Sequence, residues 1–171
     1  MMRFLIILFL TCACVQTQAQ VNIITTIAGN DTSGFKGDGG QALFAQFDHA
    51  NQLCVDKFGN LYISDAFNNR IRKIVLSTGI ITTIAGNGTG GYNGDGIQAT
   101  NAELFIPEAV CTDTLGNIYI GDAFNNRIRK VTVSSGVITT FVGTGTPGNS
   151  GDGGMATDAQ IMTPAGLTMD A

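Results

Sequence analysis

The polar residues best suited to chemistry occur in two nearly identical segments, ISDAFNNRIRK and IGDAFNNRIRK. They are Asp65, Asn68, Asn69 and Arg70 in the first copy, and Asp122, Asn125, Asn126 and Arg127 in the second. Carboxylate, amide and guanidinium groups could together bind a polar ligand, so Asn68 and Asn125 are candidates for ligand binding. A unique active site is rarely repeated in every unit, which favours a structural interpretation. Each aspartate is expected to pair with the arginine five residues later, and the asparagines to bond to turn backbone.

A second group of carboxylates lies in glycine-rich loops of the GDG type. Asp38, Asp95 and Asp152 occupy equivalent positions in these loops. Such a loop can present backbone N–H groups to an anion, but no lysine follows as in a phosphate-binding loop. The spacing of an EF-hand is also missing, so turn formation is favoured and no metal ligand is assigned. The three aspartates are kept as candidate ligand-binding residues because loops on a rigid scaffold are where binding usually occurs.

A basic stripe accompanies both polar segments. The sequence RIRK covers Arg70 to Lys73 and Arg127 to Lys130. Clustered basic residues could contact nucleic acid, but the chain carries a net charge of −4, which argues against phosphate-directed binding. The stripe is therefore interpreted as a solvated outer strand whose charges discourage pairing at a sheet edge.

These residues belong to an internal repeat of 57 residues. The motif ITTIAGN at residues 24–30 returns at 81–87, and a weaker copy, ITTFVGT, starts at Ile138. A further series, Asp56, Asp113 and Asp170, keeps the same spacing. A regular period of this length is the signature of a repeat architecture in which neighbouring units bury each other's apolar faces.

Each unit contains four short strand signals. In the second complete unit they are 109–113, 117–122, 127–133 and 137–143. They are rich in Val, Ile, Thr and Tyr and are separated by Gly, Asn and Ser, which is typical of antiparallel strands joined by tight turns. Four strands in each repeat of this length indicate an all-β propeller of four-stranded antiparallel blades. The turn after the second strand and the loop between blades are expected to share one rim of the molecule.

The segment PEAVCTDTLGNIYIGDAFNNRIRKV, residues 107–131, resembles an NHL repeat, and residues 51–74 resemble one as well. The loops GDGGQALFAQF, GDGIQATNAEL and GDGGMATDAQI are similar to the long inter-blade loops of secreted bacterial NHL proteins. The resemblance implies a propeller, often with six blades. It does not imply one function, since the family includes binding scaffolds, sensor domains, RNA binders and a few lyases.

The lyase reading requires a zinc site with several histidines, and His49 is the only histidine in the chain. A metal centre of that type needs several ligands, so within these residues the lyase interpretation fails and no cofactor is predicted. RNA binding is disfavoured by the acidity and by the leader described below. A protein or glycan partner is expected instead, and nucleic acid is not.

The first nineteen residues read as a secretory signal peptide. Arg3 gives a positive start, Phe4 to Leu10 form an apolar run, and Thr17 and Ala19 precede the cleavage point. The run is too short for a transmembrane segment. Acylation of Cys12 or Cys14, as in a lipoprotein, is a minor alternative. The protein is therefore expected to be secreted, periplasmic or at the cell surface.

Cys54 and Cys111 remain after the leader and occupy equivalent positions in the first strands of adjacent blades. Equivalent Cα atoms of neighbouring blades are expected to lie beyond bridging distance. Two free, buried thiols that pack as small apolar residues are predicted.

The expected organisation is a partial propeller after the leader. Residues 20–50 form an outer strand and loop, 51–87 a blade, 88–107 a loop, 108–143 a second blade, and 144–171 a loop and the start of a further blade. Closed propellers have four to eight blades, so a fragment of a longer protein is expected, or oligomerisation if it is complete. The favoured function is a non-enzymatic, exported scaffold that binds a protein, glycan or surface through its loop rim. The alternatives are a lactonase- or lyase-like enzyme with catalytic residues outside these residues, and a structural module of a larger surface protein.

Overall fold

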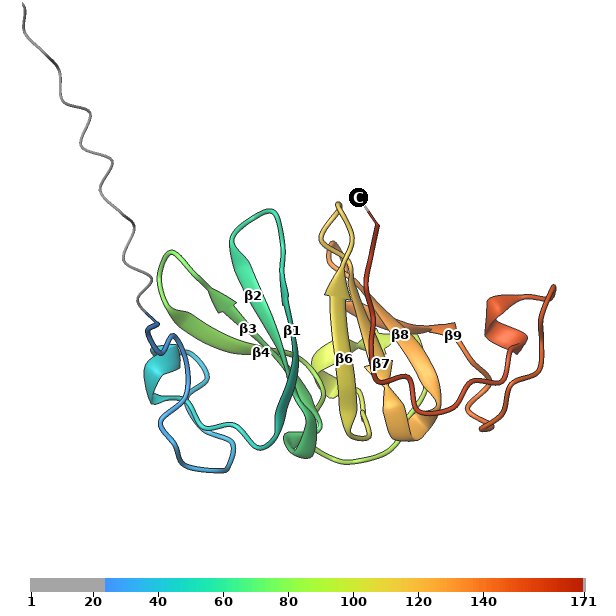
Figure 1. Ribbon diagram of the computed structural model, residues 1–171, viewed down its shortest axis with the longest axis horizontal. Coiled ribbons are helices and arrows are strands. Elements are labelled where there is room, and N and C mark those ends of the chain that lie inside the picture. Colours follow the sequence, from blue (N-terminus) through green and yellow to red (C-terminus); the bar gives the residue numbers. More distant parts are fainter. Residues whose placement is uncertain (1–23, 171) are drawn as a thin grey trace, which may run out of the picture.

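The computed structural model describes residues 24–170, and the expected signal peptide lies outside them. Two antiparallel sheets stand side by side and diverge towards one end like two blades around an axis (Figure 1). The first sheet has the order β1-β2-β3-β4, and the second has the order β5-β9-β8-β7-β6. The predicted all-β propeller architecture of four-stranded blades is confirmed.

The strands lie close to the positions that the sequence predicts. In the first blade they are β1 (Ala50–Val55), β2 (Asn60–Asp65), β3 (Arg70–Val75) and β4 (Ile80–Ala85). In the second they are β6 (Pro107–Thr112), β7 (Ile118–Asp122), β8 (Arg127–Thr132) and β9 (Val137–Val142), with β5 (Ile97–Gln98) at the edge. Short 3-10 turns link them: η1 (Ala42–Phe44), η2 (Ala66–Asn68), η3 (Ala99–Asn101), η4 (Ala123–Asn125) and η5 (Ala156–Asp158).

The turn between β2 and β3 shows how the sequence fixes the local geometry. Asn69 closes η2 in the left-handed region, with φ of 52°, a conformation that asparagine tolerates better than most residues. Gly86 follows β4 with φ of 89°, and a side chain there would collide with the carbonyl oxygen of Asn69. A glycine is therefore required where the outgoing loop passes the turn.

The main core lies between the two blades. Tyr62, Ile71 and Ala85 of the first blade pack against Val110 and Ile120 of the second. A second apolar cluster covers the other face of the first blade. Alternation along each strand places one row of apolar residues on each face, so both faces of a blade are apolar and each blade needs a neighbour.

Two details of the expected organisation differ from the structure. The basic strands β3 and β8 are not outer strands, because β4 and β9 lie outside them. Residues 24–28, which repeat the sequence of β4, do not form a strand. No counterpart of β3 lies beside them within the described residues, so they lack the partner that β4 has in the ladder.

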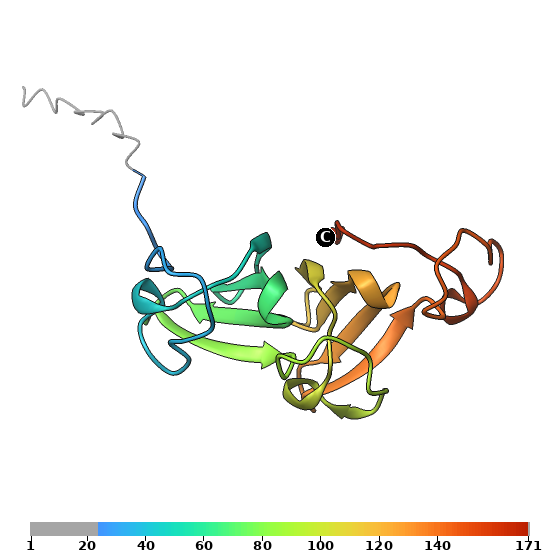
Figure 2. The ribbon, with the colours of Figure 1, turned by 90° about the horizontal axis from the view of Figure 1, so that it is seen from below.

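The loop before each blade runs back along the outer edge of that blade. Gly39 and Ala42 donate backbone hydrogen bonds to Ile81 and Gly79 at the start of β4. In the second blade the corresponding loop forms β5, whose Ile97 pairs with Ile138 of β9. Each structural unit therefore consists of a loop followed by the four strands whose edge it covers, as the view from below also shows (Figure 2).

Candidate functional site

The first polar cluster is built around the buried carboxylate of Asp65, at the end of β2. It accepts hydrogen bonds from the backbone N–H of Asp48 at 2.8 Å and from the amide of Asn68 at 2.9 Å. The guanidinium of Arg72, fully buried, pairs with it at 3.1 Å. Burial raises the pKa of Asp65 more than these donors lower it. The carboxylate is thus fully engaged inside the blade and holds the turn in place.

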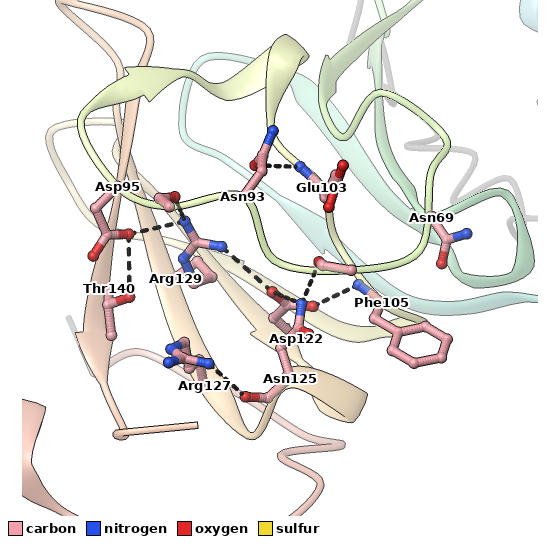
Figure 3. A network of polar contacts seen from close by, with 12 residues as sticks. Asn69, Asn93, Asp95, Glu103, Phe105, Asp122, Asn125, Arg127, Arg129 and Thr140 are labelled. Carbon is pink, nitrogen blue, oxygen red and sulfur yellow. Dashed lines mark hydrogen bonds and ion pairs between the residues drawn. The ribbon is translucent and has the colours of Figure 1, made fainter. Parts of the chain in front are cut away.

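The second blade repeats this cluster around Asp122 (Figure 3). Its carboxylate accepts hydrogen bonds from the N–H of Phe105 and from the amide of Asn125, both at 2.8 Å, and lies 3.5 Å from Arg129. Burial raises the pKa of Asp122 from 3.8 to about 6. The pairing distance is longer than in the first blade, and Nε of Arg129 has no hydrogen-bond partner within the described residues.

The predicted ion pairs of Asp65 with Arg70 and of Asp122 with Arg127 are wrong, because each carboxylate pairs with a different arginine. Asp65 and Arg70 do face each other in the ladder, but the carboxylate pairs with Arg72, two residues along β3. Arg70 and Arg72 share a face of the strand, but the guanidinium of Arg70 is bound to backbone carbonyls of the turn and loop, and that of the buried Arg72 reaches Asp65. The prediction of a solvated basic stripe also fails, because Arg72 and Arg129 are completely buried.

The aspartates of the GDG loops complete these buried pairs. Asp38 lies 2.8 Å from Arg72, and Asp95 lies 2.9 Å from Arg129. The other oxygen of Asp38 accepts a hydrogen bond from the backbone N–H of Thr83 in β4. Asp152 is exposed. Asp38 and Asp95 lie beside the outer strands β4 and β9, where they offset the charge of a buried arginine.

The remaining arginines link each turn to the next loop. Arg70 donates hydrogen bonds to the carbonyl oxygens of Asn68 at 3.0 Å and Asn87 at 2.7 Å, and its guanidinium stacks over the ring of Phe35. Arg127 repeats this arrangement with Asn125, Thr144 and the ring of Tyr92. Asn68 and Asn125 donate to Gly34 and Gly91, so their amide N–H groups serve the scaffold, and their role in ligand binding stays a prediction.

The rim displays aromatic side chains that the sequence reasoning did not single out. Phe67 in η2 and Phe124 in η4 are each about half exposed, at 52% and 51%. His49 stacks on Phe67 with ring centroids 4.5 Å apart, and Phe105 tilts against Phe124 at 5.4 Å. The signal was available in the sequence, because a phenylalanine in the middle of both AFNN turns has no partner in the blade pattern.

The two cysteines lie in the neighbouring strands β1 and β6. Both are free, as predicted, but only Cys111 is buried and Cys54 is half-buried. Sγ of Cys54 lies 3.6 Å from the hydroxyl of Thr112, and burial raises the pKa of Cys111 to about 11. Within residues 24–170 no three His, Cys, Asp or Glu side chains come close enough to hold a metal ion.

Comparison with known proteins gives the family context. A scan of protein-family models finds no match. NHL repeat-containing protein 3 from Mus musculus is 34% identical over 101 residues, and Protein SUPPRESSOR OF QUENCHING 1, chloroplastic, from Arabidopsis thaliana is 30% identical over 84 residues. Over just over half of its length, the chain is similar to NHL repeat-containing proteins. The aligned regions cover 57% and 49% of this chain, but only 26% of the mouse protein and 8% of the plant protein.

Solved structures from Bacteroides thetaiotaomicron share the fold. A structural genomics protein of unknown function has a TM-score of 0.53 and 27% identity, covering 63% of this chain and 26% of that one. A protein described as an auxiliary nutrient binding protein also has a TM-score of 0.53, with 22% identity and coverage of 77% and 38%. Among the described residues, the helices are single short turns, and none could cross a bilayer.

Proposed function

We propose that this chain is an exported, non-enzymatic binding scaffold that engages its partner through the aromatic rim. The aromatic rim is defined as the exposed rings of Phe67 and Phe124, at the β2–β3 and β7–β8 turns, together with the rings of His49 and Phe105, which stack against them from the segments before β1 and β6. One observation carries the proposal. The buried polar side chains at these turns are engaged inside the scaffold, while the aromatic rings beside them face solvent.

This arrangement, with polar groups bonded inside the scaffold and aromatic rings exposed beside them, suits recognition of a weakly polar surface. A polar group that is already hydrogen-bonded gains little from a ligand, whereas an exposed ring gains from every apolar atom laid against it. The turns that carry the rings are fixed by Asp65 and Asp122, so little entropy is lost on binding. Rings held rigidly in this way suit the C–H face of a sugar ring, and a glycan is the proposed partner.

The overall acidity supports this choice over nucleic acid. The chain has 13 acidic and 9 basic residues, and Arg72 and Arg129 are buried. A phosphate backbone would find few exposed cations on the rim. The fold is also that of a protein described as an auxiliary nutrient binding protein, which is consistent with a binding role.

The test is affinity electrophoresis of the full chain through gels that contain soluble neutral polysaccharides, with bare gels as reference. The proposal expects at least one polysaccharide to retard the chain. The double variant Phe67→Ala with Phe124→Ala should lose the retardation. Phe58→Ala is the matched control, since Phe58 is 62% exposed but lies at the β1–β2 turn, at the opposite end of the strands. Retardation that survives the double variant, or that is lost equally in the control, would remove the rim from the proposal.

A further inference from the structure

The two AFNN turns each carry a pair of aromatic rings, which we call a platform. The first platform is Phe67 with His49, whose ring centroids lie 4.5 Å apart and whose planes differ by 9°. The second platform is Phe124 with Phe105, whose centroids lie 5.4 Å apart and whose planes differ by 48°. Phe67 and Phe124 are equivalent in the repeat. The aromatic rim therefore presents one platform for each unit of sequence.

The second ring of each platform is not a copy made by the repeat. The repeat equivalent of His49 is Ile106, and that of Phe105 is Asp48. The companion ring thus comes from a different repeat position in each unit, yet it packs on the phenylalanine of the AFNN turn in both. Inheritance of the scaffold alone would place the same residue type at equivalent positions. A ring pair reached by two different substitutions points to a role for the pair itself.

The exposure of the platforms is a property of the unit. Phe67 is 52% exposed and Phe124 is 51% exposed. Both turns are contacted by the segment that follows, because the asparagine that closes each turn accepts a hydrogen bond from the backbone N–H of Ile106 or of Thr163. Within the described residues only the second turn has a complete blade before it. The two exposures nevertheless agree, so the rings protrude whichever neighbours flank the unit.

The two platforms are joined rigidly. Phe105 immediately precedes Ile106, whose backbone N–H donates a hydrogen bond to the side-chain oxygen of Asn69 at 2.9 Å. The ring of Phe105 also lies over Gly90, where a Cβ atom would come within 3.0 Å of it. The companion ring of the second platform is therefore anchored beside the turn that carries the first. The fold, and not a flexible linker, sets the spacing between the platforms.

Partly exposed carboxylates accompany both platforms. Asp48 and Glu103 stand in the loop segments that supply the companion rings. The guanidinium groups of Arg70 and Arg127 are already bonded to backbone carbonyls. Carboxylates repel an acidic polymer and accept hydrogen bonds from hydroxyl groups. The surroundings of the platforms therefore favour a neutral ligand that is rich in hydroxyl groups.

We propose that the rim binds the interior of a linear, neutral, β-1,4-linked polysaccharide, with two segments of the same sugar chain lying on the two platforms. This binding mode rests on the proposed function of the rim and specifies its ligand. A β-1,4-linked glucan, mannan or xylan is extended, so it can reach two platforms at a fixed spacing, whereas an α-1,4-linked glucan coils. The second contact forms within the same complex, so the affinity exceeds that of either platform alone.

The first experiment is isothermal titration calorimetry of the full chain with cello-, manno- and xylo-oligosaccharides of two to eight sugars. In at least one series the disaccharide should bind weakly at two sites on each chain. The longest member should bind at a single site with an affinity about a hundredfold higher, because it spans both platforms. Malto-oligosaccharides of the same lengths are the matched control and should show no such gain with length.

The single variants Phe67→Ala and Phe124→Ala test whether both platforms take part. Each should keep weak binding of the disaccharide at one site and lose the gain with length. Phe58→Ala should behave like the parent chain, because Phe58 lies between β1 and β2, at the opposite end of the strands. Thermal melting of the three variants identifies any loss of folding. A gain with length that survives either rim variant, or that occurs only with malto-oligosaccharides, would overturn the proposal.

Two negative results have different meanings. If no polysaccharide retards the parent chain in the gels, the proposed function of the rim fails, and this binding mode fails with it. If retardation depends on the rim but the longest oligosaccharides bind no more tightly than the disaccharides, the proposed function stands. The platforms then act independently, and the spanning of both by one sugar chain is refuted.

Discussion

At the residue scale, the buried arginines of the third strands determine how the polar side chains are used. Arg72 connects Asp38, from the loop, with Asp65, at the end of β2, and Arg129 does the same with Asp95 and Asp122. A charge taken out of water must be paired, so these carboxylates are committed to the fold. The repeat pattern singled out these aspartates, but it paired Asp65 with Arg70 and kept Asp38 as a ligand-binding candidate. Arg72 was missed as their partner because both faces of the strand are buried, so alternation alone does not show which cation points inward.

Removal of the buried Arg129 should therefore lower the free energy of unfolding far more than removal of Arg127, two residues before it in the same strand. Arg129→Ala leaves Asp122 buried without its cation and should lower the free energy of unfolding by about 3–5 kcal/mol. Arg127→Ala removes a half-exposed side chain and should cost about 1 kcal/mol. Urea denaturation of the two variants gives both values. Equal losses would show that the buried pair has no special role.

The raised pKa of Asp122 predicts a fall in stability as the pH rises. The folded state holds a proton up to about pH 6, and the unfolded state releases it near 3.8. Folding therefore takes up a proton between these values, and the free energy of unfolding decreases as pH rises from about 4 to 6. The pKa of Asp65 is also raised, so its titration likewise lowers the free energy of unfolding as the pH rises.

Asp56 and Asp113 act in the opposite direction and in a lower pH range. Hydrogen bonds from the side-chain amides of Asn60 and Asn117, and then from the turn backbone, lower their pKa values despite partial burial, so their contribution is lost as pH falls below about 4. The variant Asp122→Asn should flatten the stability profile between pH 4 and 6 and leave the acid limb intact. Urea titrations at a series of pH values measure this, and an unchanged profile would argue against titration of Asp122.

At the element scale, the sequence predicted the bounds of the four strands of the second blade to within two residues. Period-two alternation of apolar residues and turns rich in Gly and Asn are local signals, so a single unit is enough to read them. The path of the inter-blade loop was not predictable in this way. Its glycines indicate turns, but the pairing of Ile97 with Ile138 joins residues 41 positions apart, and no local pattern encodes it.

The inter-blade loop covers the outer strand, and hydrogen exchange at a single backbone amide of that strand measures the protection it gives. Asp38→Ala removes the acceptor of the Thr83 N–H, so hydrogen exchange at Thr83 should become at least about tenfold faster. The equivalent change in the second loop, Asp95→Ala, should leave Thr83 unaffected. Amide exchange followed by NMR distinguishes the two, and equal acceleration in both variants would indicate general destabilisation instead.

At the scale of the whole molecule, stability is shared between blades. The core between them joins strands of both sheets, so neither blade buries both of its faces alone. Repeat proteins of this kind gain much of their stability from the interfaces between units. The phenylalanine of each AFNN turn was a signal in the sequence, but the stacking of Phe67 on His49 depends on how the turn and the preceding loop are assembled.

Equivalent residues in the two blades should therefore differ in their contribution. Ile63 is buried beside a hollow of about 180 Å³ on the outer side of the first blade, whereas Ile120 is fully buried between the two blades. The loss for Ile120→Ala should be about 3–4 kcal/mol, and that for Ile63→Ala should be at least about 1 kcal/mol smaller. Thermal or urea unfolding of the two variants gives the comparison. Identical losses would mean that neighbouring blades do not contribute.

The loop that covers each outer strand also has a consequence for synthesis on the ribosome. Each loop precedes its blade in the chain, so Gly39 and Ile97 have already left the ribosome when β4 and β9 are completed. The last strand of a blade therefore meets its cover as soon as it forms, and need not wait for residues still to be translated. In a nascent chain with one finished blade, the outer strand of that blade is therefore already covered by its loop. This cover hinders edge-to-edge pairing with other nascent chains.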